Sequence, residues 1–218
     1  SNGVEITTQP TLDPSRSHAA VSFNNASATE LKSDWSDVLG LLDRAAVLFS
    51  FEQLGGAEAC MDMAKEYAMG RYAFGRSIAS FQAIKHKLAE QCIRTYACES
   101  ATYRATQNID DAIAALKADG MEHGEATLKG IADFAPECAM IKVLGSEILD
   151  YTVDEAVQVF GGMGYSAETR AELAYRDARI NRIFEGTNEI NRMLTVDMLL
   201  KKAMKGELDL TTPAMAIA

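Results

Sequence analysis

Apolar residues recur at steps of three and four along most of the chain, which is the spacing of one face of an α-helix. Proline is absent between positions 33 and 135, so no residue in that stretch is expected to break a helix. The pattern predicts helices of roughly 30 residues or more, well above the average of about 11 to 12, packed together as a bundle. Two series of one-face positions are Phe81, Ile84, Leu88, Cys92, Tyr96 and Ile131, Phe134, Cys138, Ile141, Ile148, Thr152, Ala156, Val159.

Glycines and capping residues mark the loops that should join these helices. Residues 185–189 predict a turn leading into a final helix, because Thr187 or Asn188 can accept hydrogen bonds from the first backbone N–H groups. The glycines at the three earlier breaks are Gly70 and Gly75, then Gly120 and Gly124, then Gly161, Gly162 and Gly164.

The first 32 residues have a different pattern. Residues 4–7 and 19–23 are short β-prone runs, and the turn between them contains Pro10 and Pro14. Two strands do not form a stable sheet alone. We therefore expect them to belong to a larger β-domain or to pack on another part of the protein.

Composition excludes several classes of function. The formal net charge of -10 argues against nucleic acid as a partner, because this field repels a phosphate backbone. No run of 18 or more apolar residues occurs, so no membrane span is expected, and the three histidines are too dispersed to predict a metal site. Cys60, Cys92, Cys98 and Cys138 lack the paired spacing of zinc sites or disulfide frameworks. They predict free thiols in a reducing compartment, the cytoplasm or, in a eukaryote, the mitochondrial matrix.

Three segments carry a resemblance to a known family. In their order, spacing and residue types they resemble the acyl-CoA dehydrogenases, and the similarity extends from about Gly3 to Leu208. Residues 133–208 look most similar to the very-long-chain type, whereas residues before about Leu116 resemble the family in general. The three segments are residues 71–78 with Gln82, residues 158–165, and Arg176-Asp177 leading to residues 182–190.

The resemblance implies a mainly α fold, a long-helix up-and-down bundle corresponding to the family's C-terminal domain, with a short N-terminal β remnant. Residues 1–32 would then be the end of the family's middle β-domain. Residues 33–208 would form the bundle that carries the flavin and catalytic motifs, and residues 209–218 a loose tail.

Abstraction of an α-proton from a thioester requires a base, and a carboxylate serves only where an apolar pocket raises its pKa towards neutrality. The resemblance assigns this role to Glu185, whose backbone N–H would also bind the thioester carbonyl. Phe184 supplies an apolar wall, and Gly186 lets the substrate approach the backbone. The implied reaction is FAD-dependent α,β-dehydrogenation of an acyl-CoA, with the hydride passing to the flavin.

The same resemblance implies FAD contacts in two further segments and at the last turn. Arg71 and Gln82 match positions that reach the FAD of a neighbouring subunit, and Phe74 would pack on the cofactor. Considered without the family, Arg71 is an ordinary helix-end cation, and a Gly-Gly-x-Gly run commonly just ends a helix. The remaining residues implied are Gln158, Val159, Phe160, Gly161 and Gly162 at the adenine end, and Thr187, Asn188 and Glu189 as further flavin contacts.

One of the matched positions differs from the family pattern, and two further positions match the part of the family that binds the acyl-CoA. Glu189 stands where many relatives carry glutamine, and a carboxylate near a phosphate is unfavourable unless it points away. Asp43 and Arg44 match a helix position that lies along the acyl-CoA in relatives. Many relatives have an arginine where this chain has Ala46, so either Arg44 replaces it or the CoA end is held differently. Some branches place the base on this helix, but Ala45 and Ala46 cannot serve, and Glu185 keeps the assignment.

The partners implied by the resemblance are an acyl-CoA substrate, an electron-accepting flavoprotein and further copies of the chain in a dimer or tetramer. Arg176 and Asp177 are expected to be a structural ion pair and not catalytic residues. One rival hypothesis is a non-catalytic fragment or assembly subunit of a flavoenzyme, because the family's N-terminal helical domain and most of its β-domain are not in this sequence. Another is an oxidase or other flavoenzyme on the same fold.

Overall fold

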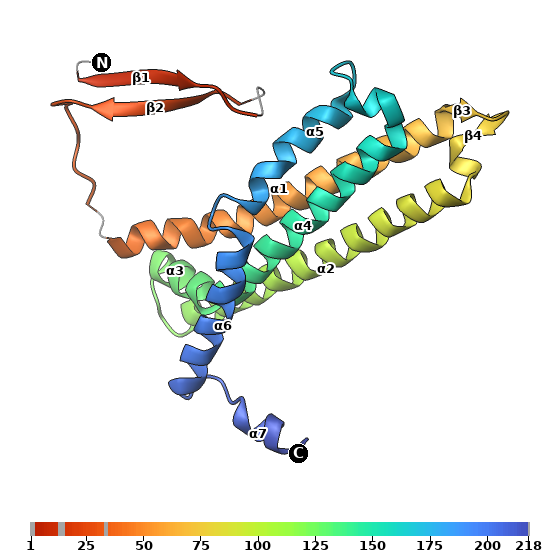
Figure 1. Ribbon diagram of the computed structural model, residues 1–218. Helices are drawn as coiled ribbons and strands as arrows, with labels where there is room; N and C mark the ends of the chain where they lie inside the picture. The colour runs from red at the N-terminus through yellow and green to blue at the C-terminus, as the bar shows by residue number, and fades with distance from the viewer. Residues whose placement is uncertain (1–2, 13–15, 33–34, 218) are drawn as a thin grey trace.

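The computed structural model describes residues 3–12, 16–32 and 35–217, apart from the side chains at positions 36, 37, 39, 42, 43 and 211. This part of the chain is mainly α-helical, which confirms the predicted fold class (Figure 1). The helices are α1 Trp35–Gly70, α2 Gln82–Ala118, α3 His123–Asp133, α4 Ala135–Phe160, α5 Arg170–Ala178, α6 Asn188–Met204 and α7 Thr211–Met215. The short 3-10 helices are η1 Ile78–Ser80, η2 Gly161–Tyr165 and η3 Arg179–Arg182.

The three long helices α1, α2 and α4 run alongside one another, and α6 packs against α4 (Figure 1). Small side chains form much of the contact between α1 and α4. Ala57, Ala64 and Ala68 of α1 are fully buried in one cluster with Val153 and Ala156 of α4. Alanines at this seam let the two backbones approach closely, so α4 is enclosed along most of its length.

The apolar series from Ile131 to Val159 spans two helices, not one. Helix α3 ends at Asp133 and α4 begins at Ala135, with Pro136 in its first turn. Proline fits this place because the first turn of a helix has no use for its missing N–H. The apolar faces of both helices point into the core. The apolar periodicity therefore continues across the break and does not reveal it.

Two small hairpins lie outside the bundle. Strands β1 Val4–Gln9 and β2 His18–Phe23 are antiparallel and almost entirely exposed on both faces. The Arg16 guanidinium joins this hairpin to the helices through ion pairs of 2.8 Å to Glu52 and 3.4 Å to Asp177. The second hairpin, β3 Tyr72–Ala73 and β4 Arg76–Ser77, connects η1 and α2 to the end of α1.

At the other end of the chain, α7 is a single short helix within the segment 209–218. Among the residues that the structure describes, no helix combines the length and the apolar character needed to cross a bilayer.

Candidate active site

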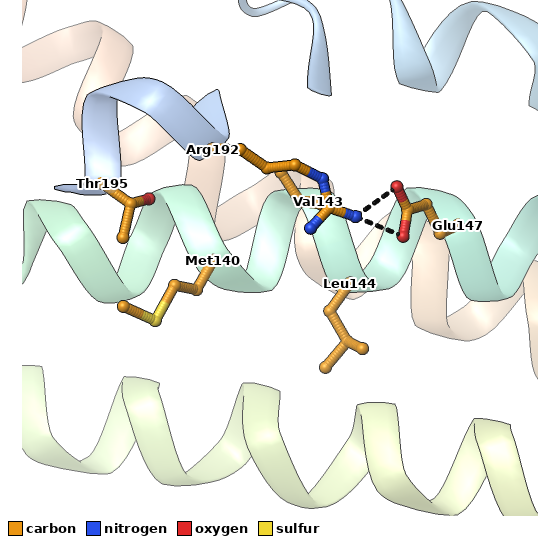
Figure 2. A pocket seen from close by; sticks show the side chains of 6 residues that line it. All are labelled: Met140, Val143, Leu144, Glu147, Arg192 and Thr195. Carbon is orange, nitrogen blue, oxygen red and sulfur yellow. Dashed lines mark hydrogen bonds and ion pairs between the residues drawn. The ribbon is translucent and has the colours of Figure 1, made fainter. Parts of the chain in front are cut away.

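Helices α4 and α6 together form a cavity of about 420 Å³, lined by both apolar and polar side chains (Figure 2). At its rim Arg192 of α6 donates two hydrogen bonds, of 2.7 and 2.8 Å, to the Glu147 carboxylate of α4. None of the residues predicted from the sequence lines this cavity. The lining residues are Met140, Val143, Leu144, Glu147, Arg192 and Thr195.

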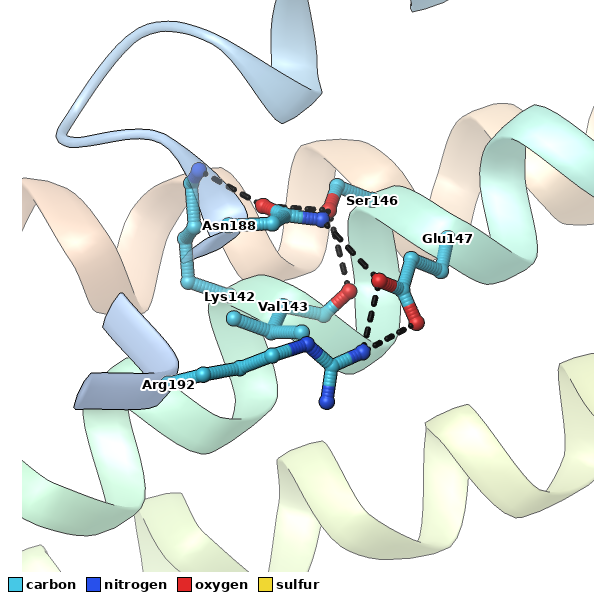
Figure 3. A network of polar contacts seen from close by, with 6 residues as sticks. All are labelled: Lys142, Val143, Ser146, Glu147, Asn188 and Arg192. Carbon is cyan, nitrogen blue, oxygen red and sulfur yellow. Dashed lines mark hydrogen bonds and ion pairs between the residues drawn. The ribbon is translucent and has the colours of Figure 1, made fainter. Parts of the chain in front are cut away.

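A buried polar network continues from this ion pair to the start of α6 (Figure 3). The Asn188 amide donates to Ser146 Oγ at 2.9 Å, and Ser146 Oγ donates to the Val143 carbonyl at 2.9 Å. Lys142 Nζ donates to Asn188 Oδ1 at 3.0 Å and to the Gly186 carbonyl at 2.8 Å. Polar side chains of α4 thus hold the first residue of α6 and the turn before it.

Lys142 is a site residue that the sequence analysis missed. Its side chain is 1% exposed, and burial lowers its pKa, whereas the negative charges of Glu185 and Glu189 act in the opposite direction. The available signal was its place between Ile141 and Val143 in a helix that is apolar on most sides. A lysine there cannot reach water easily, so it must find partners inside the protein.

The turn before α6 has an unusual backbone. Glu185 has a φ of 56° and Gly186 a φ of 76°, so two consecutive residues are left-handed. Glycine adopts this conformation freely, but a glutamate does so at a cost of order 1–3 kcal/mol. Thr187, one of the two predicted caps, ends the turn as the helix N-cap and accepts a hydrogen bond of 3.3 Å from the Ile190 N–H.

Asn191, one turn into α6, binds this segment from the helix side. Its Nδ2 lies 3.1 Å from the Glu185 carbonyl oxygen, 2.8 Å from that of Gly186 and 3.2 Å from that of Thr187. The amide is buried, so these carbonyls are satisfied without water. Asn191 was also not predicted from the sequence.

The Glu185 segment has an apolar side. The Phe184 ring packs on the Phe49 ring of α1, with centroids 4.8 Å apart. Phe184 and Ile183 also line a cavity of about 360 Å³ together with α5, η3 and the first hairpin. Glu185 itself is half-buried, at the edge between this apolar surface and the polar network.

A second group of predicted residues lies at the far end of the bundle, next to β3 and β4. Arg71, Val159, Phe160, Gly161 and Gly162 line one cavity of about 420 Å³. A Cβ added at either glycine would meet nothing within 4 Å, so open space faces both. The structure therefore brings together residues that are almost 90 positions apart in the sequence.

Three other predicted residues lie near this end but do not line the cavity. Gln158 is exposed on the last turn of α4. Phe74 is 95% exposed at the tip of the β3–β4 hairpin, where it and Gly75 both have positive φ, as a type I′ turn requires. Gln82 begins α2, and its Nε2 lies 2.9 Å from the His86 ring.

The two groups of predicted residues do not form one site within the chain. Asn188 contacts α4 at Ser146, whereas the second cavity includes Phe160 at the end of the same helix. At 1.5 Å per residue these places are about 20 Å apart along α4.

The remaining predicted residues have local roles. Arg44 is exposed on α1, and the side chain of Asp43 lies outside the described residues. Arg176 pairs with Glu172 at 2.7 Å, and Asp177 pairs with Arg16, so the two residues form separate structural ion pairs. Within the described ranges, no group of three His, Cys, Asp or Glu side chains could hold a metal ion.

Glu189 is held at the start of α6. A hydrogen bond from its own backbone N–H lowers its pKa, and a bond from the Thr187 hydroxyl adds to this effect. Arg182 and Arg192 contribute in the same direction. The carboxylate therefore acts as a negative charge at a helix N-terminus, which is a favourable place for it.

Comparisons with known proteins agree with this arrangement. The family model described as acyl-CoA dehydrogenase, C-terminal domain, matches residues 35–200. A probable acyl-CoA dehydrogenase from Bacillus subtilis (strain 168) is 43% identical over 164 residues, which cover 75% of this chain and 28% of that protein. The mitochondrial short-chain specific acyl-CoA dehydrogenase of Bos taurus is 36% identical over 160 residues, covering 73% of this chain and 34% of the relative.

A solved structure extends the match to the hairpin at the start of the chain. The crystal structure of an acyl-CoA dehydrogenase complexed with FAD from Bacillus anthracis aligns with a TM-score of 0.87 and 36% identity, covering 99% of this chain and 38% of that one. The chain thus spans about a third of the length of these relatives. Since the family model runs from the start of α1 into α6 and includes both groups of predicted residues, the chain belongs to the acyl-CoA dehydrogenase family.

Proposed function

We propose that the protein containing this chain is an FAD-dependent acyl-CoA dehydrogenase in which the Glu185 carboxylate removes the α-proton of the acyl thioester. The observation that supports this role best is the left-handed backbone of Glu185 at the end of an apolar segment. Strain of this kind persists only where surrounding contacts enforce it, and it is concentrated at functional sites. The proton passes from the α-carbon to a carboxylate oxygen, while the adjacent Gly186 leaves room for the substrate.

The residues around the second cavity fit FAD. Arg71 offers a guanidinium fork to a pyrophosphate, and the open space at Gly161 and Gly162 lets a ligand reach the backbone there. The Bacillus anthracis relative is complexed with FAD, which agrees with this fit. FAD, when bound, supplies the acceptor for the hydride of the β-carbon.

The proposal, following the family resemblance, is that the two groups contact two different cofactors. In this proposal Arg71, Phe74 and Gln82 of one subunit bind the FAD of its neighbour. Thr187 and Asn188 contact the FAD of their own subunit, with Glu189 held beside them by its own backbone. The site then requires a homo-oligomer, a dimer or a tetramer.

The substrate side of the proposal uses Phe184 and Gly186 at the reacting end of an acyl-CoA, with Asp43 and Arg44 of α1 along the rest of the molecule. The reduced enzyme would pass its electrons to a second flavoprotein. A very-long-chain substrate stays a prediction, which a series of acyl-CoA thioesters of increasing length tests directly. Free thiols such as buried Cys60 and Cys98 suit a reducing compartment, the cytoplasm or the mitochondrial matrix.

The test is Glu185→Gln in the full-length protein. The amide keeps the shape of the side chain but cannot accept a proton near neutral pH. We expect FAD to remain bound and the rate of flavin bleaching by acyl-CoA to fall by roughly 10² to 10⁴-fold. The measurement is stopped-flow absorbance at the flavin band, with FAD content determined from the same samples.

Glu189→Gln is the matched control, four residues away on the same helix start. It should keep most of the bleaching rate, because Glu189 is held by its own backbone and by Thr187. If Glu185→Gln bleached at the parent rate and Glu189→Gln lost most of its bleaching rate, the assignment of Glu185 as the base would be wrong.

A further inference from the structure

We propose that Lys142 is a positioning residue for Glu185. Its ammonium group and the Asn191 amide together bind the backbone carbonyls of residues 185 and 186, and these hydrogen bonds keep the strained turn in one conformation. This inference rests on the proposed role of Glu185 as the base. It assigns a function to a buried lysine that lies far from the cofactor residues at the end of α4 and that also donates a hydrogen bond to Asn188 at the start of α6.

The first argument is the strain itself. A non-glycine residue with a φ of 56° needs contacts that outweigh its cost. The Glu185 carbonyl accepts a hydrogen bond from the Asn191 amide. The Gly186 carbonyl accepts hydrogen bonds from both Asn191 and Lys142, at 2.8 Å each. The turn is therefore bound from α6 on one side and from α4 on the other.

The second argument concerns direction. In a trans peptide unit the carbonyl and the N–H point to opposite sides. Because the carbonyls of Glu185 and Gly186 point at Asn191 and Lys142, the N–H groups of Gly186 and Thr187 point away from them. The hydrogen bonds to these carbonyls thus fix the orientation of the backbone that carries the Glu185 side chain.

The third argument is the cost of burying an ammonium group. Residues as apolar as those beside it, Ile141 and Val143, would fill the same space without desolvating a charge. Burial lowers the pKa of Lys142, but Glu185 and Glu189 oppose that shift. A side chain that only filled space would not need a donor aimed at the Gly186 carbonyl.

The test is Lys142→Met in the full-length enzyme with excess FAD. Methionine keeps the length and apolar stem of lysine and removes the donor. We expect kcat for acyl-CoA-dependent flavin reduction to fall about tenfold or more, since a hydrogen bond from a charged group is lost, while KM and FAD content stay near parental values. Lys201→Met removes an exposed lysine that pairs with Asp197 on α6, and it should leave kcat unchanged.

A second measurement does not depend on turnover. Hydrogen exchange followed by mass spectrometry on the protein without substrate should show faster exchange, by about tenfold, in peptides covering residues 184–190. Peptides from α2 serve as the internal reference and should not change. If Lys142→Met fails to fold, Asn191→Leu removes the other half of the same contact and should give the same two results.

The outcomes separate this inference from the proposed function. If Glu185→Gln is inactive but Lys142→Met keeps the parental kcat, the positioning role of Lys142 is overturned. The assignment of Glu185 as the base then still holds. A Lys142→Met enzyme that loses FAD and thermal stability in parallel with activity shows a merely structural lysine and also overturns it. Parental activity in Glu185→Gln removes the proposed base and this inference with it.

Discussion

The Tyr67 ring stacks on the Phe160 ring, with centroids 4.0 Å apart and planes 16° apart. This contact joins the last turns of α1 and α4, and both rings line the cavity that also contains Arg71 and Gly161. The cavity is therefore built by two helix ends that stacking holds together. The residues that line it come from segments that are far apart in the sequence.

Removal of the Arg71 guanidinium should weaken FAD binding. We expect Arg71→Ala to lower FAD affinity about tenfold or more in the full-length protein, because a charge-assisted contact to phosphate is lost. Fluorescence titration of the apoenzyme with FAD measures this. Arg94→Ala removes an exposed arginine that pairs with Glu90, and it should leave the affinity unchanged. Equal affinities for the parent and Arg71→Ala would exclude Arg71 from the cofactor site.

Gly164 is needed for the close approach of η2 to α4. A Cβ there would lie 2.5 Å from the Val157 carbonyl oxygen and 2.9 Å from Phe160 Cβ, and backbone cannot move aside cheaply. Gly164→Ala should lower the free energy of unfolding by about 1 to 3 kcal/mol. Urea unfolding followed by circular dichroism measures the change.

Gly55 is the matched control for that substitution. It lies within α1, and an added Cβ would meet nothing within 4 Å. Gly55→Ala should raise the free energy of unfolding by roughly 0.5 to 1 kcal/mol, because alanine loses less conformational freedom in a helix. Equal effects of the two substitutions would contradict the packing described for η2.

Cys60 should make the protein less stable at alkaline pH. Burial raises the pKa of this thiol from its ordinary value of 9.0 to about 11. Between these values the unfolded chain has lost the proton and the folded chain still holds it, so a rise in pH favours unfolding. The contribution is up to about 2 to 3 kcal/mol between pH 8 and 11.

Melting temperatures across that pH range test the effect. Cys60→Ala should lose stability less steeply than the parent as pH rises. Cys92→Ala replaces an exposed thiol and should follow the parent slope. Identical slopes for all three proteins would mean that Cys60 ionises in the folded state as easily as in the unfolded chain.

The chain should self-associate in solution. Helix α6 presents a row of large exposed apolar side chains, and surfaces of this kind usually mark interfaces. Multi-angle light scattering at micromolar concentration should give the mass of a dimer or tetramer. A monodisperse monomer would contradict both this prediction and the proposal that a neighbouring subunit completes the FAD site. The exposed residues are Ile190, Met193, Leu194, Val196, Leu200 and Met204.

Helical periodicity and turn residues were sufficient to predict much of the architecture. Helix α1 ends at Gly70 as expected, and Gly120, with a φ of 93°, follows the end of α2. Thr187 was one of two predicted caps for α6. These features depend on a few neighbouring residues, so the local sequence contains the information. The break at Phe134 was missed because both flanking helices bury the same apolar face.

The amino-acid sequence by itself determined the helical character of the chain, the ends marked by glycines and the motif that contains Glu185. Tertiary structure decided which residues meet. Lys142 reaches the Gly186 carbonyl across 44 positions, and the Ser146 hydroxyl meets Asn188 across 42. The apolar neighbours of Lys142 indicate that it is buried, but they do not identify its partners. Its partners depend on where α4 packs against α6, and long-range packing, rather than local periodicity, sets that contact.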